Sequence, residues 1–151
     1  LNTFSVVSGQ LKKPVEGNKF LPFIPASKLV TEFKGSFNRL TNNVRNFYVK
    51  FEVDNTFTKN NVFTAYNTET KTSGYSLLNA GVGADIVNKK NQTLFSLGFS
   101  AMNIADVAYQ NHLSRLKYAE ENLATGRTGV FNMGRNFSIK LNVPLTVNLK
   151  K

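Results

Sequence analysis

The stretch that decides the fold is residues 129–151, which read Gly-Val-Phe-Asn-Met-Gly-Arg-Asn-Phe-Ser-Ile-Lys-Leu-Asn-Val-Pro-Leu-Thr-Val-Asn-Leu-Lys-Lys. From Phe131 to Leu149, apolar residues occupy nearly every odd position and mostly polar residues occupy the even ones. Side chains of a strand alternate between two faces, so this period of two predicts one apolar and one polar face. The alternation runs well beyond the ~5–6 residues of a typical strand. It therefore favours a long strand in the wall of a barrel.

Earlier segments repeat this pattern. The sequence predicts an all-β chain of about six long antiparallel strands, at residues 2–12, 28–37, 45–58, 75–87, 93–103 and 129–149. The connectors alternate in length: long at about 13–27, 59–74 and 105–128, and short at 38–43 and 88–92. Long loops at one side and short turns at the other are typical of transmembrane β-barrels, which have at least about eight strands. We therefore expect this chain, which begins at Leu1, to be the C-terminal part of a larger barrel.

The two faces of the predicted strands differ in chemistry. Charged side chains that succeed one another along one face must be wet or mutually paired, because a buried unpaired charge is costly. The polar face, which would line the barrel lumen, carries Lys50, Glu52, Asp54, Asp85 and Lys140, together with Asn79, Ser96 and Asn142. The opposite face, which would contact lipid, carries Phe47, Val49, Phe51, Val53, Val82, Ile86, Phe95, Phe99, Ile139 and Leu141.

Composition narrows the function. The net charge of +10 raises the question of nucleic acid, but the Lys and Arg residues are scattered with no run of four, so we predict no nucleic-acid partner. With no Cys and one His, we expect no metal site and no cofactor. No apolar run approaches the ~20 residues of a membrane helix. We find no catalytic residues; a glycosidase-like pair of Glu52 and Asp54 is a weaker alternative to a lumen-facing charge ladder.

Four segments carry a family resemblance. Asn103, Ile104, Asp106 and Tyr109 fit an Asn-(Leu/Ile)-x-Asp-x-x-Tyr end of a penultimate strand, and Gly126-Arg127 fits the start of a closing strand. Residues 74–79 (Gly-Tyr-Ser-Leu-Leu-Asn) fit a Gly-Tyr-x-Leu-x-(Asn/Asp) strand, and residues 21–26 (Leu-Pro-Phe-Ile-Pro-Ala) fit a Leu-Pro-x-Ile-Pro-x loop. In this order, the four resemble the C-terminal end of TonB-dependent outer-membrane receptors of the Bacteroidetes type.

This resemblance implies a location in the outer membrane of a Gram-negative bacterium and the uptake of a scarce large solute, such as an iron chelate, a corrinoid or a glycan. It implies no enzyme activity. The expected partners are outer-membrane lipid, the remaining strands and plug of the receptor, and the TonB complex through a region absent here. The chain departs from the family pattern at its end, Leu149-Lys150-Lys151, where an aromatic residue is usual.

Solute binding would fall to the long loop before the closing strand. Within it, the candidate ligand-facing residues are Asn111, His112, Arg115 and Arg127. From its polar surroundings alone, His112 is expected to be a solvated loop residue. The alternative to a receptor is a soluble, basic β-sandwich or small barrel that acts as a binding module, because alternating strands also form soluble antiparallel sheets.

Overall fold

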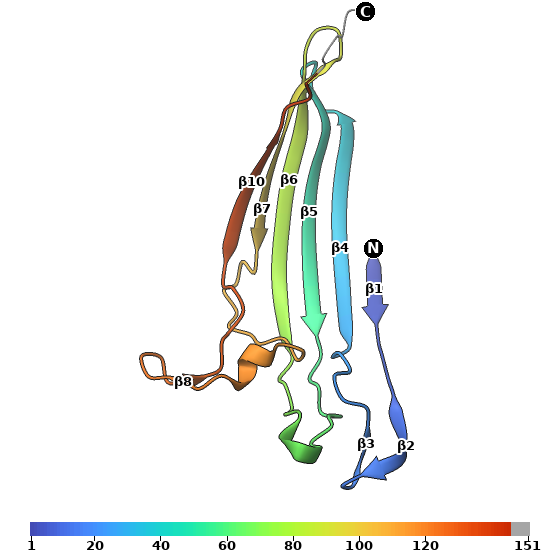
Figure 1. Ribbon diagram of the computed structural model, residues 1–151. Coiled ribbons are helices and arrows are strands. Elements are labelled where there is room, and N and C mark those ends of the chain that lie inside the picture. Colours follow the sequence, from blue (N-terminus) through green and yellow to red (C-terminus); the bar gives the residue numbers. More distant parts are fainter. Residues whose placement is uncertain (146–151) are drawn as a thin grey trace, which may run out of the picture.

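A computed structural model describes residues 1–145 and shows an all-β chain with antiparallel sheets, as predicted. Its main sheet has six strands in the order β1-β4-β5-β6-β7-β10, and every neighbouring pair is antiparallel (Figure 1). These strands are β1 (Asn2–Ser5), β4 (Lys28–Arg39), β5 (Val44–Thr56), β6 (Tyr75–Val87), β7 (Thr93–Met102) and β10 (Asn136–Asn142). Among the described residues, no helix is long and apolar enough to cross a membrane.

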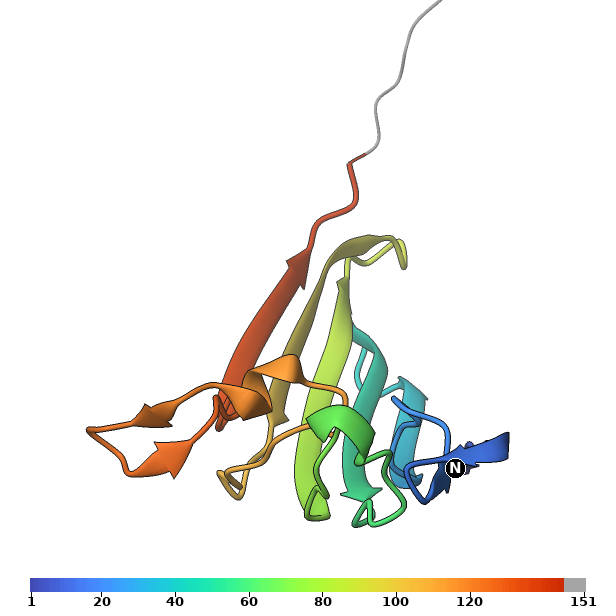
Figure 2. The ribbon, with the colours of Figure 1, turned by 60° about the horizontal axis from the view of Figure 1, so that its bottom comes forward.

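The connections at the two ends of the sheet differ in size. Short turns join β4 to β5 and β6 to β7 at one end, here called the turn end (Figure 1). All long connections lie at the opposite end, here called the loop end. The loop end holds two small hairpins, β2 (Gln10–Val15) with β3 (Asn18–Phe20) and β8 (Glu121–Asn122) with β9 (Arg127–Thr128), and two 3₁₀ turns, η1 (Ala65–Asn67) and η2 (Arg115–Tyr118). Figure 2, with the loop end forward, shows the two hairpins on opposite sides of the sheet.

The first and last strands differ from their predicted bounds. The segment 2–12 is interrupted: β1 ends at Ser5, where the adjacent apolar residues Val6 and Val7 break the alternation, and residues 10–12 belong to β2. In its described part, residues 129–145, the segment 129–149 contains one strand, β10. Residues 129–135 lie in the loop end, because β7 ends at Met102 and offers no strand beside them. Pro144, which has no N–H to donate, follows β10 closely; residues 146–149 lie outside the described residues.

The register places all ten predicted apolar positions on one face, because directly opposed residues of antiparallel strands share a side. Whole rows of this face are apolar across the sheet: Phe33, Phe51, Ala80, Ala101 and Phe137 form one row, and Val49, Val82, Phe99 and Ile139 belong to the next. Most of the large side chains in these rows are nevertheless open to solvent, although Ala101 is buried: Phe51 is 41% exposed and Ile139 is 75% exposed. The part of the chain that the structure describes contains no second layer over them.

A compact group of buried apolar residues lies at the loop end. Val62, Phe63 and Ala65, all in the connection between β5 and β6, are buried. Among the described apolar residues of the sheet, Leu77 and Val87 of β6 and Ala101 of β7 are the ones buried to this degree. The sheet is therefore a single layer whose apolar face still needs a covering surface, whereas the loop end is packed by its own residues.

On the polar face, glycine makes room for an aromatic ring. A Cβ atom at Gly83 would lie 2.6 Å from Cε1 of Tyr48, the residue directly opposite it on β5. At Gly81, on the same strand and face, the nearest atom would be 3.6 Å away. The Tyr48 ring therefore lies against the bare backbone of Gly83, where it covers a stretch of sheet that has no side chain of its own.

Replacing Gly83 by Ala is expected to lower the free energy of unfolding by about 1–3 kcal/mol, because the Tyr48 ring must leave its position. The matched change Gly81→Ala should stay within about 0.5 kcal/mol of the parent protein, since its new methyl group meets only ordinary contacts. Urea unfolding followed by circular dichroism measures both. Equal losses for the two variants would contradict the packing of Tyr48 on Gly83.

Candidate functional site

A buried carboxylate joins two long connections at the loop end. The side chain of Glu69, which follows η1, is 3% exposed. Its Oε1 atom accepts a hydrogen bond from the backbone N–H of Phe23 at 2.8 Å, and its Oε2 atom accepts one from the N–H of Phe63 at 3.0 Å. Backbone donors to a carboxylate form strong, charge-assisted hydrogen bonds. Glu69 thereby fixes the connection between β3 and β4 against the one between β5 and β6.

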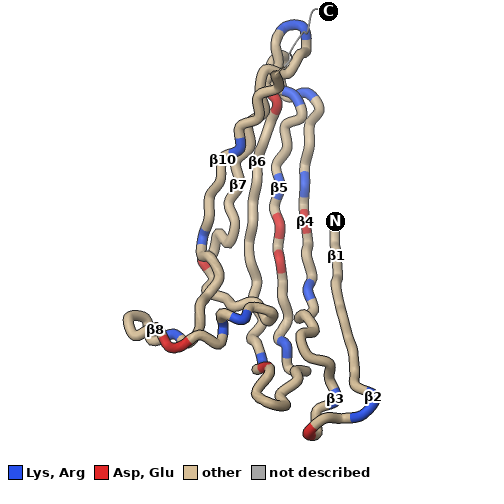
Figure 3. Tube along the Cα trace, viewed as in Figure 1, with Lys and Arg blue, Asp and Glu red and all other residues tan. Residues whose placement is uncertain are grey.

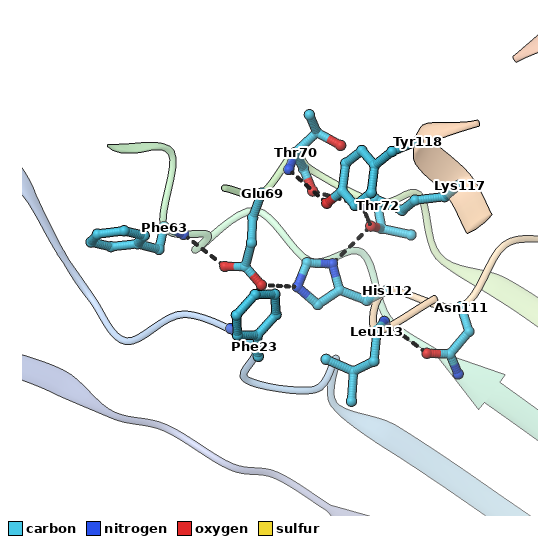
Figure 4. Close-up of polar contacts among 10 residues, drawn as sticks. All are labelled: Phe23, Phe63, Glu69, Thr70, Thr72, Asn111, His112, Leu113, Lys117 and Tyr118. Carbon is cyan, nitrogen blue, oxygen red and sulfur yellow. Dashed lines mark hydrogen bonds and ion pairs between the residues drawn. The ribbon is translucent and has the colours of Figure 1, made fainter. Parts of the chain in front are cut away.

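His112 completes a polar network with Glu69 (Figure 4). Its side chain is 1% exposed, so the expectation of a solvated loop residue is wrong, whereas a ligand-facing role stays a prediction. The His112 Nε2 atom lies 3.4 Å from Oε1 of Glu69, which is long for a hydrogen bond, and Nδ1 lies 2.8 Å from Oγ1 of Thr72. The network is buried because segments distant in sequence fold over it, which the local sequence does not reveal.

Lys117, in η2, sets the direction of the hydrogen bonds. Its Nζ atom donates to Oγ1 of Thr72 at 2.7 Å and to the carbonyl oxygen of Thr70 at 2.9 Å. An ammonium group has no acceptor, so the Thr72 hydroxyl proton is left to donate to Nδ1 of His112. Neutral His112 then carries its own proton on Nε2, which faces the carboxylate of Glu69. The hydrogen bonds thus run from Lys117 through Thr72 to His112, whose Nε2 atom faces Glu69 without a hydrogen bond.

Burial lowers the pKa of His112 below its ordinary value of 6.5, and the positive charges of Lys117 and Lys59 lower it further, against the opposing effect of Glu69. The unfolded chain therefore binds more protons than the folded one as the pH falls below about 6.5. We expect the stability of the loop end to be fully present above that pH and to decrease below it. His112→Gln should remove this dependence; pH-dependent hydrogen exchange of residues 59–74 measures it. Protection that rises between pH 6.5 and 5 would contradict the assignment.

A cavity of about 360 Å³ lies beside this network. Its walls include Thr72 and Lys117 from the network, together with Ser73, Tyr75 and Tyr109. The rings of Tyr75 and Tyr109 are 4.4 Å apart between centroids. Burial, and then the neighbouring Tyr75, raises the pKa of Tyr109, so its hydroxyl keeps its proton at neutral pH. The cavity thus combines hydroxyl groups, aromatic surface and a cation.

The other candidate loop residues lie around this site without forming a single cluster. Asn111 is exposed, and its Oδ1 accepts a hydrogen bond from the backbone N–H of Leu113 at 2.9 Å, which stabilises the local turn. The guanidinium group of Arg115 lies 5.9 Å from the ring centroid of Phe23. That of Arg127 lies 5.2 Å from the ring of Phe131, a residue of the cavity wall. Of the four, Arg127 alone stacks on a wall residue of the cavity.

The predicted lumen-facing residues share the polar face of the sheet. Lys50 lies between two carboxylates, with Nζ 3.3 Å from Oε2 of Glu32 and 3.1 Å from Oε2 of Glu52. Asp54 pairs with Lys28 at 2.7 Å. These contacts engage the acidic groups of β5, including both carboxylates of the glycosidase-like alternative.

Asp85 and Lys140, the other two charged residues predicted to face the lumen, lie nearer the turn end of the polar face. Asp85 accepts a hydrogen bond from Nδ2 of Asn46 at 2.7 Å. Lys140 stands opposite Gly98 in the register of β10 and β7. Within residues 1–145, no three His, Asp or Glu side chains are grouped in a way that could hold a metal ion.

Comparisons with family models, curated proteins and solved structures found no match for this chain.

Proposed function

We propose that this chain forms part of the wall and the extracellular loops of a TonB-dependent outer-membrane receptor, which takes up a scarce large solute. The observation that carries the proposal is the open apolar face of the main sheet. Phe33 is 65% exposed and Phe137 is 60% exposed, at opposite sides of a continuous apolar row. Large contiguous apolar surfaces mark protein or membrane contacts, and lipid covers such a face without a second protein layer.

Strand length supports a membrane location. β5 and β6 have 13 residues each, β4 has 12 and β7 has 10. A tilted transmembrane strand needs about 9–11 residues to cross the hydrocarbon region. The alternation of apolar and polar side chains continues along most of each strand, as it does in a barrel with a wet interior. The paired charges of Lys50, Glu32 and Glu52 suit that polar interior.

The distribution of charge indicates how the sheet would be oriented in the membrane (Figure 3). Beyond the pair of Phe37 and Phe47, the register places Arg39 opposite Arg45, and Lys89 and Lys90 lie in the neighbouring turn. Basic side chains are favourable at the level of lipid headgroups and costly in the hydrocarbon region. The turn end would accordingly meet the inner headgroup layer, and the larger loop end would face outward.

The edges of the sheet support a larger barrel. β1 and β10 are the two outer strands, and they do not pair with each other. Unpaired strand edges do not occur in the hydrocarbon region, because their N–H and C=O groups would lack partners. We propose that further strands of the same receptor pair with both edges, and that the receptor's plug fills the lumen. Coupling to the TonB complex would then pass through the plug.

A blot of bacterial membranes tests this function. An antibody against residues 111–124 would be used on outer-membrane and soluble fractions, with heated and unheated samples. We expect a band in the outer membrane several times the size of the 151-residue chain, with a mobility that changes on heating as a folded barrel opens. A band of the chain's own size in the soluble fraction would refute the receptor.

The soluble binding module remains a second candidate, favoured by the net charge of +10. It requires a second layer over the apolar face, which residues 1–145 do not provide and a second copy of the chain would have to supply. Detergent distinguishes the two. A lipid-facing sheet aggregates when detergent is removed, whereas a face-to-face dimer stays in solution at a defined mass.

A further inference from the structure

A buried cation forms part of the wall of the loop-end cavity. Lys117 is 7% exposed and lines the cavity beside Thr72. Both hydrogen-bond acceptors of its Nζ atom, the carbonyl oxygen of Thr70 and Oγ1 of Thr72, are uncharged. Among the described residues, no carboxylate oxygen lies within 4.0 Å of it. An ammonium group has three protons, so one donor is left beyond these two bonds.

The nearest acidic group of the network does not compensate this charge directly. Both oxygen atoms of Glu69 are engaged by backbone N–H groups, and His112 and Thr72 stand between Glu69 and Lys117. A second basic residue, Lys71, also lines the cavity. Buried charges are costly unless they are paired, so the cavity has an unmet preference for an anion. The ring of Tyr118, 4.9 Å from Nζ, favours the cation but supplies no negative charge.

The rest of the wall favours a hydroxylated ring. Ser73, Tyr75 and Tyr109 offer hydroxyl groups, and Phe131 adds an aromatic surface. The volume of about 360 Å³ lies at the small end of the ~300–1,000 Å³ of ligand pockets. It suits one sugar-sized group rather than an extended polymer.

We propose that the loop-end cavity binds a sugar-sized hydroxylated ring that bears an oxyanion, with the oxyanion on Lys117. Lys71 increases the positive potential of the site, and the aromatic wall packs on the ring. The biological role of this ligand, as the solute or an end group of it, rests on the proposed receptor function. The binding itself does not, because all wall residues of the cavity except Tyr75, the first residue of β6, lie in loops outside the sheet.

Calorimetric titration of the purified protein in detergent tests the site. The probes are glucuronate and glucose 6-phosphate, with glucose as the neutral match. We expect the better oxyanion ligand to bind at least about tenfold more tightly than glucose, and higher ionic strength to weaken it. The stronger of the two probes identifies the oxyanion as carboxylate or phosphate. Equal binding of glucose, or no binding of either anion, would overturn the proposal.

Variants locate the binding. Lys117→Met should weaken the better anion at least about tenfold and leave glucose unchanged; Lys71→Gln should weaken it about two- to fivefold. The matched control is Lys12→Gln in the β2–β3 hairpin, which is not part of the cavity wall. If Lys117→Met does not fold, the Lys71→Gln variant tests the site instead. A loss of anion affinity in Lys71→Gln no larger than that in Lys12→Gln would contradict the site. Anion binding by a protein found only in the soluble fraction would refute the receptor and support the anion site. A protein found in the outer membrane that binds neither anion would support the receptor and refute the anion site.

Discussion

Phe51→Lys is expected to lower the free energy of unfolding by about 2–4 kcal/mol in a bilayer, the cost of a cationic side chain at the midplane of the lipid-facing surface. Phe51 lies in the middle of β5, between Phe33 on β4 and Ala80 on β6, and is 41% exposed in the isolated chain. In water alone, its replacement would cost little, because much of the ring is already solvated. The size of the effect therefore reports what covers the apolar face.

The measurement is urea unfolding of the protein folded into phospholipid vesicles, compared with Ser36→Lys. Ser36 is exposed on the polar face of β4, opposite Tyr48, so a Lys there should remain in the wet interior and change stability by less than about 1 kcal/mol. Similar small effects of both variants would count against any covered position for Phe51, whether in lipid or in a protein core.

Glu69→Leu is expected to open the loop end. It removes the acceptor of two backbone N–H groups and the partner of His112, all in a buried site. Unsatisfied buried donors cost about 1–3 kcal/mol each. Because the network packs loops rather than the sheet, we expect local opening with the strands retained.

Limited digestion with trypsin measures this opening, since Arg115, Lys117 and Arg127 lie in the affected loop. Cleavage there should become at least about tenfold faster in Glu69→Leu and rise less in Glu69→Gln, which keeps one acceptor oxygen. Glu120→Gln, at an exposed position of the same loop, should leave the rate unchanged. Unchanged cleavage of Glu69→Leu would show that the carboxylate does not hold the loops together.

Sequence periodicity was sufficient for the wall of the sheet because each strand carries its own signal. The alternation of apolar and polar residues from Phe47 to Val53 predicts the two faces of β5 without information from any other segment. Strand ends were less certain, since they depend on a neighbour: β10 begins at Asn136 because β7 ends at Met102. The bulge in β5 is another such case, where Asn46 adopts a φ of 48°, a conformation that Asn tolerates well.

The buried network could not be predicted because its members are remote in sequence. Thr72 and His112 are 40 residues apart, and Phe23 and Glu69 are 46 residues apart. Glu69 and Thr72 occur in a polar stretch rich in Asn and Thr, and His112 follows Gln110 and Asn111, so both titratable residues have the local sequence of an exposed loop. The alternating pattern that predicts a strand gives no information on which loops fold over each other.

The order β1-β4-β5-β6-β7-β10 has a consequence for how the chain assembles. Each strand pairs only with the strands that precede and follow it in the main sheet, so β4–β5 and β6–β7 can form first as local hairpins across their short turns. Their joining closes the longer connection between β5 and β6, and the entropy of closing a loop grows only slowly with its length. Local contacts form fast compared with distant ones. The chain can therefore add to a growing wall in pairs of strands, with the network of Glu69 and His112 formed last, once both outer loops are in place.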